Sequence, residues 1–237
     1  MTKTDYLKRY RFPLQVMVIA IILHIFLKSR DASILLHFLL RAKVSHKTIC
    51  DWTNKFYSPL NAPPIKYSKK KVLICHVDEK FIKVNGIIHY WWSLKDSFGN
   101  IIHKIITPSR DLPSAKRLLK EARVKIDRDV DILIRDGLPA YGKATKYLGR
   151  KCKSIISGIN GKGFLFKKKF YWKTNNPIES LNSEIDAFLP RFQYNFASLH
   201  SAEKYADIFM LHKHLRRCFD SKKFSEASSM LVQAITI

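Results

Sequence analysis

The chain has 237 residues, with 43 Lys and Arg against 19 Asp and Glu, so its net charge is +24. Hydrophobic residues make up 46% and aromatic residues 12%, which excludes a disordered polyelectrolyte and predicts a folded core. A folded chain that keeps such an excess of positive charge, despite its self-repulsion, usually has a polyanionic partner. Nucleic acid is the first candidate for that partner, and an anionic membrane surface is the second.

The cysteines and the longest apolar stretch bear on the compartment. The four cysteines are far apart and form no C-x-x-C pair, which argues against a structural zinc site and a disulfide framework and favours a reducing cytoplasm. The most apolar stretch, residues 14–27, has 14 residues, whereas a membrane-spanning helix needs about 20. No small-residue cleavage site follows it, so we expect a buried helix in preference to a signal peptide or a membrane anchor.

The segment before residue 57 predicts three helices. After the first, apolar residues at helical spacing predict a second over residues 32–40, capped by Ser29 or Asp31, and Ser45 caps a third over residues 46–56. Two short helices joined by a tight turn, the second with a basic start, are typical of a helix-turn-helix DNA-binding domain. An ordinary three-helix bundle is the alternative. In the DNA-binding interpretation the contacts come from His46, Lys47, Thr48 and Lys55.

Composition changes sharply after the helical segment. Residues 57–71 hold three prolines and four lysines and predict a linker. Beyond it, β-branched and apolar runs over residues 72–84, 87–97 and 100–107 predict three strands in an antiparallel meander. We therefore divide the chain into a helix-turn-helix domain (1–56), a linker (57–71) and a second domain (72–237).

Helices and strands alternate in the rest of the second domain. Asp111 is expected to cap a helix over residues 112–124. The elements predicted after it are a strand over 129–137, a helix over 139–149, a strand over 152–157, a basic loop over 158–174, and helices over 177–189 and 198–218. The order β-β-β-α-β-α-β-α predicts an α/β fold, a mixed sheet with helices on its faces.

Three acidic residues stand where chemistry would need them. Asp78 lies in the first strand of the sheet, Asp136 at the carboxyl end of the fourth strand, and Glu179 in the first turn of a late helix. Groups at the carboxyl ends of strands converge on the ligand crevice of open α/β sheets. Carboxylates that meet there suit Mg²⁺, and two such ions about 3.5–4 Å apart can clamp a phosphodiester for in-line displacement.

Each of these carboxylates also has a purely structural interpretation. Asp78 can face solvent from an open sheet, and Asp136 with the next residue forms an Asp-Gly turn. Glu179 stands three residues after Asn176, which is the spacing of a capping box. Their joint occurrence in this strand order favours the catalytic interpretation.

These motifs resemble those of DDE-type insertion-sequence transposases, a compact bacterial and archaeal family with an N-terminal helix-turn-helix and a ribonuclease H-like integrase core. VSHKTICDWTNKF is similar to the family's recognition helix, and HVDEKFIKVNGIIHYWW to its first catalytic strand and hairpin. SRDLPSAKRLLKEA resembles the helix that follows, RDGLPAY carries the second aspartate, and NNPIE carries the glutamate. The resemblance extends along nearly the whole chain.

The resemblance implies that Asp78, Asp136 and Glu179 form the catalytic and metal-binding triad, with two Mg²⁺ or Mn²⁺ ions in each active site. It also implies a cytoplasmic, nucleoid-associated prokaryotic enzyme that binds transposon ends and target DNA as a homodimer or larger assembly. Such an enzyme cleaves DNA strands and transfers them. A metal-dependent nuclease or resolvase on the same fold, and a catalytically inactive DNA-binding relic, are the alternatives.

Two features depart from the family pattern. From Asp136 to Glu179 is 43 positions, and the extra length falls in the basic segment 158–173. Lysines interleaved with aromatic residues in that segment suit a DNA strand, although a solvated hairpin explains them as well. These lysines are Lys162, Lys167, Lys168, Lys169 and Lys173. Asp186 stands where the family usually carries Lys or Arg seven residues after the glutamate, an exchange expected to weaken binding of the transposon end.

Overall fold

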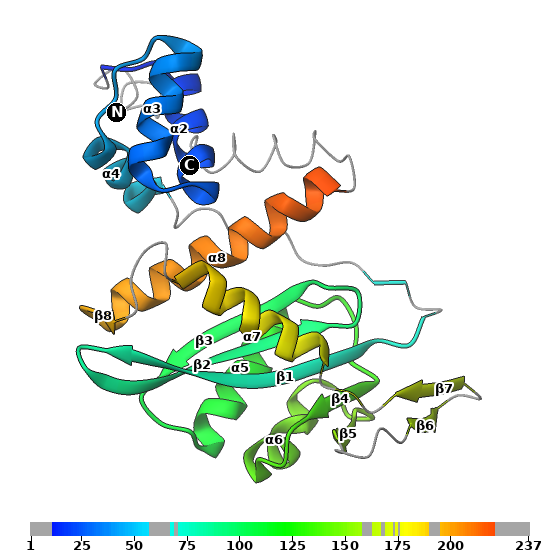
Figure 1. Cartoon of the computed structure of the whole chain (residues 1–237). Coiled ribbons are helices and arrows are strands. Elements are labelled where there is room, and N and C mark those ends of the chain that lie inside the picture. The colour runs from blue at the N-terminus through cyan, green and yellow to red at the C-terminus, as the bar shows by residue number, and fades with distance from the viewer. Residues whose placement is uncertain are drawn as a thin grey trace, which may run out of the picture. The chain divides into compact units, whose positions relative to one another are not determined.

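A computed structural model of the chain divides into two compact units, residues 1–62 with 204–237, and residues 63–203 (Figure 1). The structure describes residues 11–56, 67–68, 71–157, 163–166, 169–172, 174, 176–189 and 195–220, with side chains left out at 56, 163–166, 169–172, 218 and 219. This division groups residues 204–237 with the N-terminal helices. The domain boundaries that we expected from the sequence stay a prediction.

The first unit contains three short helices, α2 (Leu14–Phe26), α3 (Ser29–Leu40) and α4 (His46–Phe56). Met17, Leu36 and Ile49 are among the side chains buried in this unit. The Ser45 hydroxyl accepts a hydrogen bond from the Thr48 backbone N–H at 3.1 Å, which confirms the predicted cap of α4. The predicted cap of α3 was wrong, because α3 begins at Ser29 after Lys28, and no side chain caps it. None of the described helices is both long enough and apolar enough to cross a bilayer.

The second unit is built on a sheet in the order β3-β2-β1-β4-β5, with β8 (Asn195–Phe196) pairing β1. The strands are β1 (Ile74–Val84), β2 (Ile87–Asp96), β3 (Ile101–Thr107), β4 (Ile132–Arg135) and β5 (Lys153–Ile156). The first three form the predicted antiparallel meander, and β1, β4 and β5 run parallel. Asn85 and Gly86 both have positive φ, as a two-residue Asn-Gly hairpin turn between β1 and β2 requires.

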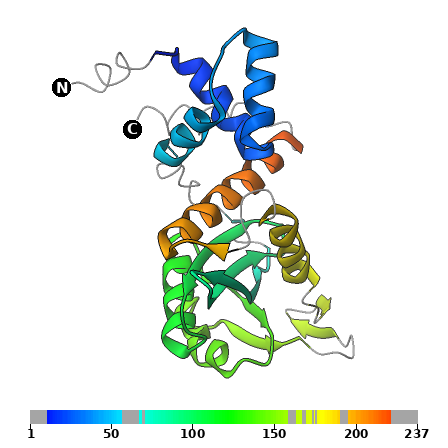
Figure 2. The same cartoon turned by 60° about the vertical axis from the view of Figure 1, so that its left-hand side comes forward.

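Helices cover both faces of this sheet (Figures 1 and 2). On one face, Cys75 and Val77 of β1 share a buried core with residues of α5 (Leu112–Val124) and α6 (Pro139–Ala144). Side chains alternate along a strand, so Asp78 and Lys80 belong to the other face. There, α7 (Asn176–Phe188) packs against β1 and β2. The mixed sheet between helical layers is the ribonuclease H-like α/β fold that the sequence predicted.

The basic segment after β5 contains a hairpin where we expected a loop. β6 (Gly163–Phe166) and β7 (Lys169–Trp172) pair in antiparallel register, because their apolar and aromatic residues favour extended backbone. Lys162, Lys167, Lys168 and Lys173 lie outside the described residues, as does the side chain of Lys169. The expectation that these lysines contact DNA stays a prediction. The final helix, α8, covers Leu199–Asp220, close to the predicted range.

Candidate active site

The site lies where the sheet opens beside β1. β1 pairs with β4 only from Ile74 to Val77, and β8 pairs with it again at Lys83 and Val84. Between these two pairings, the described residues place no strand along that edge of β1. β4 ends at Arg135, the partner of Val77, so the chain delivers Asp136 to the level of Asp78. This is how two carboxylates that are far apart in the sequence come together.

Asp136 is held by the turn that connects β4 to α6. Its Oδ1 accepts a hydrogen bond from the Leu138 backbone N–H at 2.9 Å. The Arg135 guanidinium donates to the carbonyl oxygens of Asp136 and Leu138, at 2.8 and 3.1 Å. The predicted Asp-Gly turn is therefore present, and it fixes the carboxylate within the site. The structural and catalytic interpretations of Asp136 are compatible.

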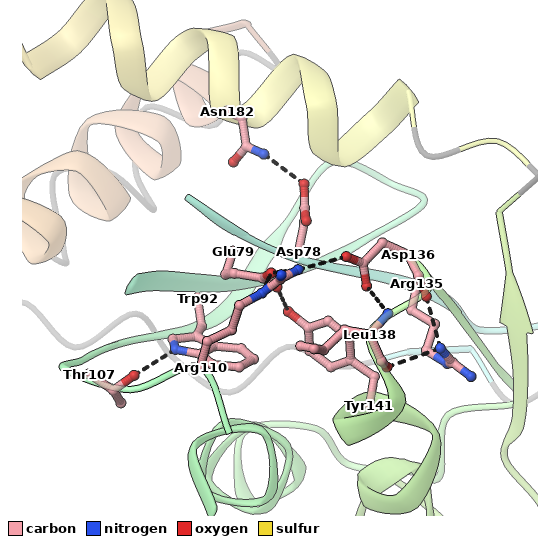
Figure 3. Close-up of polar contacts among 10 residues, drawn as sticks. All are labelled: Asp78, Glu79, Trp92, Thr107, Arg110, Arg135, Asp136, Leu138, Tyr141 and Asn182. Carbon is pink, nitrogen blue, oxygen red and sulfur yellow. Dashed lines mark hydrogen bonds and ion pairs between the residues drawn. The ribbon is translucent and has the colours of Figure 1, made fainter. Parts of the chain in front are cut away.

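Asp78 is half-buried on the face that α7 covers. The Asn182 side-chain amide donates a hydrogen bond to Asp78 Oδ2 at 2.8 Å (Figure 3). Burial, with added repulsion from the Glu79 and Asp136 carboxylates, raises the pKa of Asp78 from 3.8 to about 6. A carboxyl group that ionises reluctantly gains from a nearby cation, because the cation removes the penalty of the buried charge.

Glu79, next along β1, is buried on the opposite face of the sheet. Tyr141 donates a hydrogen bond from its hydroxyl to Glu79 Oε2, and Arg110 forms an ion pair with Glu79 Oε1. Arg110 also donates to Asp136 Oδ2 at 3.0 Å, so its guanidinium bridges two carboxylates (Figure 3). Burial raises the pKa of Glu79, although its bonds to Tyr141 and Arg110 act in the opposite direction.

Asp78, Glu79 and Asp136 together form a carboxylate cluster. Each offers one oxygen atom, and these atoms lie within 4.8 Å of one another. The ligand oxygens of Mg²⁺ lie about 2.1 Å from the ion, so opposite ligands are about 4.2 Å apart. The cluster therefore has the donor chemistry for a hard divalent cation such as Mg²⁺ or Mn²⁺.

Glu179 is exposed in the first turn of α7 and is not part of this cluster. Contacts along α7 nevertheless place it near the same level of the sheet. The Pro177 carbonyl accepts a hydrogen bond from Lys95, the partner of His76 in β1, and Asn182 donates to Asp78. Glu179 lies between Pro177 and Asn182 on the helix, so its backbone is alongside the stretch from His76 to Asp78. Its role as third ligand stays a prediction.

Asp186, the residue that departs from the family pattern, forms an ion pair with Lys80 of β1 at 2.7 Å. Position 186 is seven residues after Glu179 and therefore on the same side of the helix. The Asp186 side chain is 63% exposed, and such pairs contribute roughly 0–1 kcal/mol to stability. The pair places the Lys80 ammonium beside position 186 of α7.

Sequence reasoning missed three participants in this network: Glu79, Arg110 and Tyr141. Glu79 stands beside Asp78 in the HVDE motif, but neighbouring strand residues point to opposite faces, so the motif gives no reason to expect both carboxylates at one site. Arg110 and Tyr141 are separated from Glu79 by 31 and 62 positions, and no local pattern links them. The motifs SRDLP and RDGLPAY carried the only signal, since each was part of the stated resemblance.

The expected DNA contacts in the first unit lie at both ends of α4. His46, Lys47 and Lys55 are exposed, and Thr48 is half-buried with its hydroxyl 2.8 Å from that of Ser45. Exposure makes these side chains accessible, and their contact with DNA stays a prediction.

The fold and the carboxylate cluster define a ribonuclease H-like protein with an acidic site. A family model described as a DDE domain, of the IS240 transposase type, matches residues 72–218. The chain belongs to this family of DDE transposase domains. The match covers the whole carboxylate network and α7.

Comparisons with solved structures and curated sequences add little to the family match. One similar structure is a chain of the simian T-cell lymphotropic virus intasome in complex with PP2A regulatory subunit B56 gamma, with 13% identity and a TM-score of 0.39. The match covers 73% of the present chain and 60% of the viral one. Another is endonuclease V from Bacillus subtilis, with 11% identity, a TM-score of 0.25, and coverage of 76% and 95%. A search of curated proteins gave no match.

Proposed function

We propose that this DDE transposase binds the ends of a transposon, cleaves DNA with two divalent metal ions and transfers the cut strand to target DNA. The observation that carries the proposal is the convergence of Asp78 and Asp136, with Glu79, to within 4.8 Å. When bound, two Mg²⁺ or Mn²⁺ ions would activate the attacking oxygen and stabilise the leaving oxygen. Asp78 and Asp136 would hold both ions, and Glu179 would complete one site.

The protein's own groups prepare these ligands. Asn182 orients the Asp78 carboxylate, and the Leu138 N–H orients that of Asp136. The nucleophile is water in cleavage and a DNA 3′-hydroxyl in strand transfer, so no protein–DNA covalent bond is needed. Two transposon ends must be handled together, and we therefore expect a dimer or a larger assembly.

The direct test uses a labelled duplex of the DNA that flanks the gene, incubated with Mg²⁺ or Mn²⁺. We expect nicking at the element's end and joined products for the wild type. Asp136→Asn should lower the cleavage rate by about a thousandfold, because loss of a metal ligand removes several kcal/mol of transition-state stabilisation. Cleavage without joining would favour a nuclease or resolvase. Salt-sensitive binding with no cleavage by either protein would leave an inactive DNA-binding relic.

A group of lysines around Tyr147 supports DNA binding by the second unit. The ammonium groups of Lys116, Lys120 and Lys146 lie 5.4, 5.3 and 5.6 Å from the centre of the Tyr147 ring. Within the described residues, none of the three has a carboxylate partner. Three cations around one ring repel each other, and a DNA phosphate would relieve that repulsion.

Replacing these lysines should make binding of duplex DNA less dependent on salt. In Lys116→Gln/Lys120→Gln/Lys146→Gln, we expect the slope of log K against log salt concentration to become shallower by about two to three, because each lost phosphate contact removes about 0.9. Fluorescence anisotropy between low and moderate salt measures that slope. The matched control replaces the exposed Lys83, Lys143 and Lys151. Equal changes in the two triple variants would contradict a specific contact around Tyr147.

A further inference from the structure

Arg110 is a cation in direct contact with the carboxylate cluster. Its Nη2 lies 3.0 Å from Asp136 Oδ2, and the same guanidinium pairs with Glu79 Oε1. Glu79 is deeply buried, with 2% of its side chain exposed, whereas the Asp136 side chain is 32% exposed. The guanidinium therefore joins one inaccessible carboxylate to one that a metal ion can reach.

The backbone that carries Arg110 is fixed on both sides. Before it, the Thr107 hydroxyl donates to the Ser109 carbonyl at 2.7 Å and accepts from the Trp92 indole at 2.7 Å. After it, Asp111 caps α5 by accepting the Ser114 N–H at 2.9 Å. Because a sheet residue and a helix cap anchor this short segment, the backbone at Arg110 has little freedom. The guanidinium can therefore move mainly by rotation about the side-chain torsions.

Glu79 is engaged at both oxygens. Tyr141, fully buried, donates to Oε2, and its ring packs edge-to-face on Trp92 at 5.5 Å. Arg110 occupies Oε1. A carboxylate held by a buried phenol and a guanidinium is well placed to anchor that guanidinium. A metal ion that approached Glu79 would be repelled by the positive charge of Arg110 unless it displaced the guanidinium.

We propose that Arg110 is a built-in counter-cation of the active site, anchored by Glu79, which holds Asp136 in the metal-free protein and competes with the divalent ion for it. The inference rests on the proposed metal-dependent function. Glu79 then acts through Arg110 as a positioning residue, and Arg110 sets how tightly the ion binds. The Arg110 guanidinium compensates the like charges of Glu79 and Asp136 until the ion replaces it at Asp136.

The experiment measures Mn²⁺ affinity by calorimetry in the full-length protein without DNA. In Arg110→Gln we expect the affinity to rise about tenfold, because a unit charge about 5 Å from a divalent ion in a water-like dielectric has an effect of that size. Arg110→Lys loses the planar fork that bridges the two carboxylates but keeps the unit charge, so it should bind Mn²⁺ within about threefold of the wild type. Arg117→Gln is the matched control, since Arg117 pairs with Glu121 within α5 and should leave the affinity unchanged.

The sign of the change separates this role from a merely structural one. If Arg110 only kept the ligands in position, Arg110→Gln would bind Mn²⁺ more weakly, and that result would overturn the proposal. A tenfold gain in Arg110→Lys as well would also overturn it, because the charge would then not be the cause. Circular dichroism confirms that each variant is folded before its affinity is compared.

A double-substitution cycle tests the role of Glu79. In the Arg110→Gln background, Glu79→Gln should lower Mn²⁺ affinity by no more than about tenfold, which is the electrostatic effect of one charge about 5 Å from the ion, since Glu79 no longer has a cation to anchor. A further large loss would make Glu79 a metal ligand and reject the positioning role. Asp136→Asn distinguishes failure of the wider proposal: if the wild type and Asp136→Asn bind Mn²⁺ equally poorly, the metal-dependent function itself fails.

Discussion

Glu179→Gln is expected to lower the rate of DNA cleavage by about two to three orders of magnitude while the fold is kept. If Glu179 completes a metal site, its loss removes several kcal/mol of transition-state stabilisation, and each 1.4 kcal/mol is about tenfold in rate. The competing interpretation is that this carboxylate only stabilises the start of α7. That role is worth about 0.3–1 kcal/mol of folding free energy and does not affect cleavage.

Single-turnover cleavage of the labelled transposon end and thermal unfolding together measure both quantities. Glu184→Gln is the matched control, because it makes the same change on the same helix about 140° around the axis from Glu179. We expect it to cleave at the wild-type rate. Unchanged cleavage by Glu179→Gln, with loss in Glu79→Gln, would exclude Glu179 and leave Asp78, Glu79 and Asp136 as the triad.

Asp78→Asn is expected to abolish cleavage and yet stabilise the metal-free protein. The pKa of Asp78 is raised from 3.8 to about 6, first by burial and then by the charge of Glu79. The unfolded chain therefore binds fewer protons than the folded one between these two values, so stability falls as pH rises through this window. The penalty is fully present above pH 6 and amounts to about 1–3 kcal/mol, after allowing for partial exposure.

Differential scanning calorimetry in a chelator checks this prediction. At pH 7.5 the Tm of Asp78→Asn should exceed that of the wild type by about 2–4 °C for each kcal/mol. Near pH 4 the two proteins should have similar Tm values. Adding Mg²⁺ should raise the Tm of the wild type more than that of the variant, because binding to the folded state stabilises by mass action. A lower Tm for Asp78→Asn at pH 7.5 would contradict an unfavourable buried charge.

Much of the fold followed from local patterns. The α4 and α5 ranges were predicted to the residue, because Ser45 and Asp111 mark their starts and both accept the expected capping bond. The strands of the meander were found within one or two residues, since β-branched and apolar runs act locally. The basic segment was the exception, because lysine-rich alternation fits a loop and a hairpin equally well.

The candidate site also has some features that local patterns predict and others that depend on tertiary packing. Asp78 and Asp136 come together because β1 and β4 are parallel neighbours, with Val77 opposite Arg135, and both carboxylates follow directly after that pair. The depth at which Glu79 is buried depends on Tyr141 and Arg110, which reach it from two other elements. No periodic pattern in the sequence predicts these contacts between distant residues.

By itself, the sequence determined the fold class, the order of its elements, the positive charge that calls for a polyanion, and two of the acidic residues that meet at the site. Each of these depends on neighbouring residues, on composition, or on motifs that stay together along the chain. Only the tertiary structure decided that Arg110 bridges Glu79 and Asp136, that Lys80 pairs with Asp186, and that Glu179 lies outside the cluster. Those contacts join positions up to 106 residues apart, and their distances are fixed by how the sheet and helices pack.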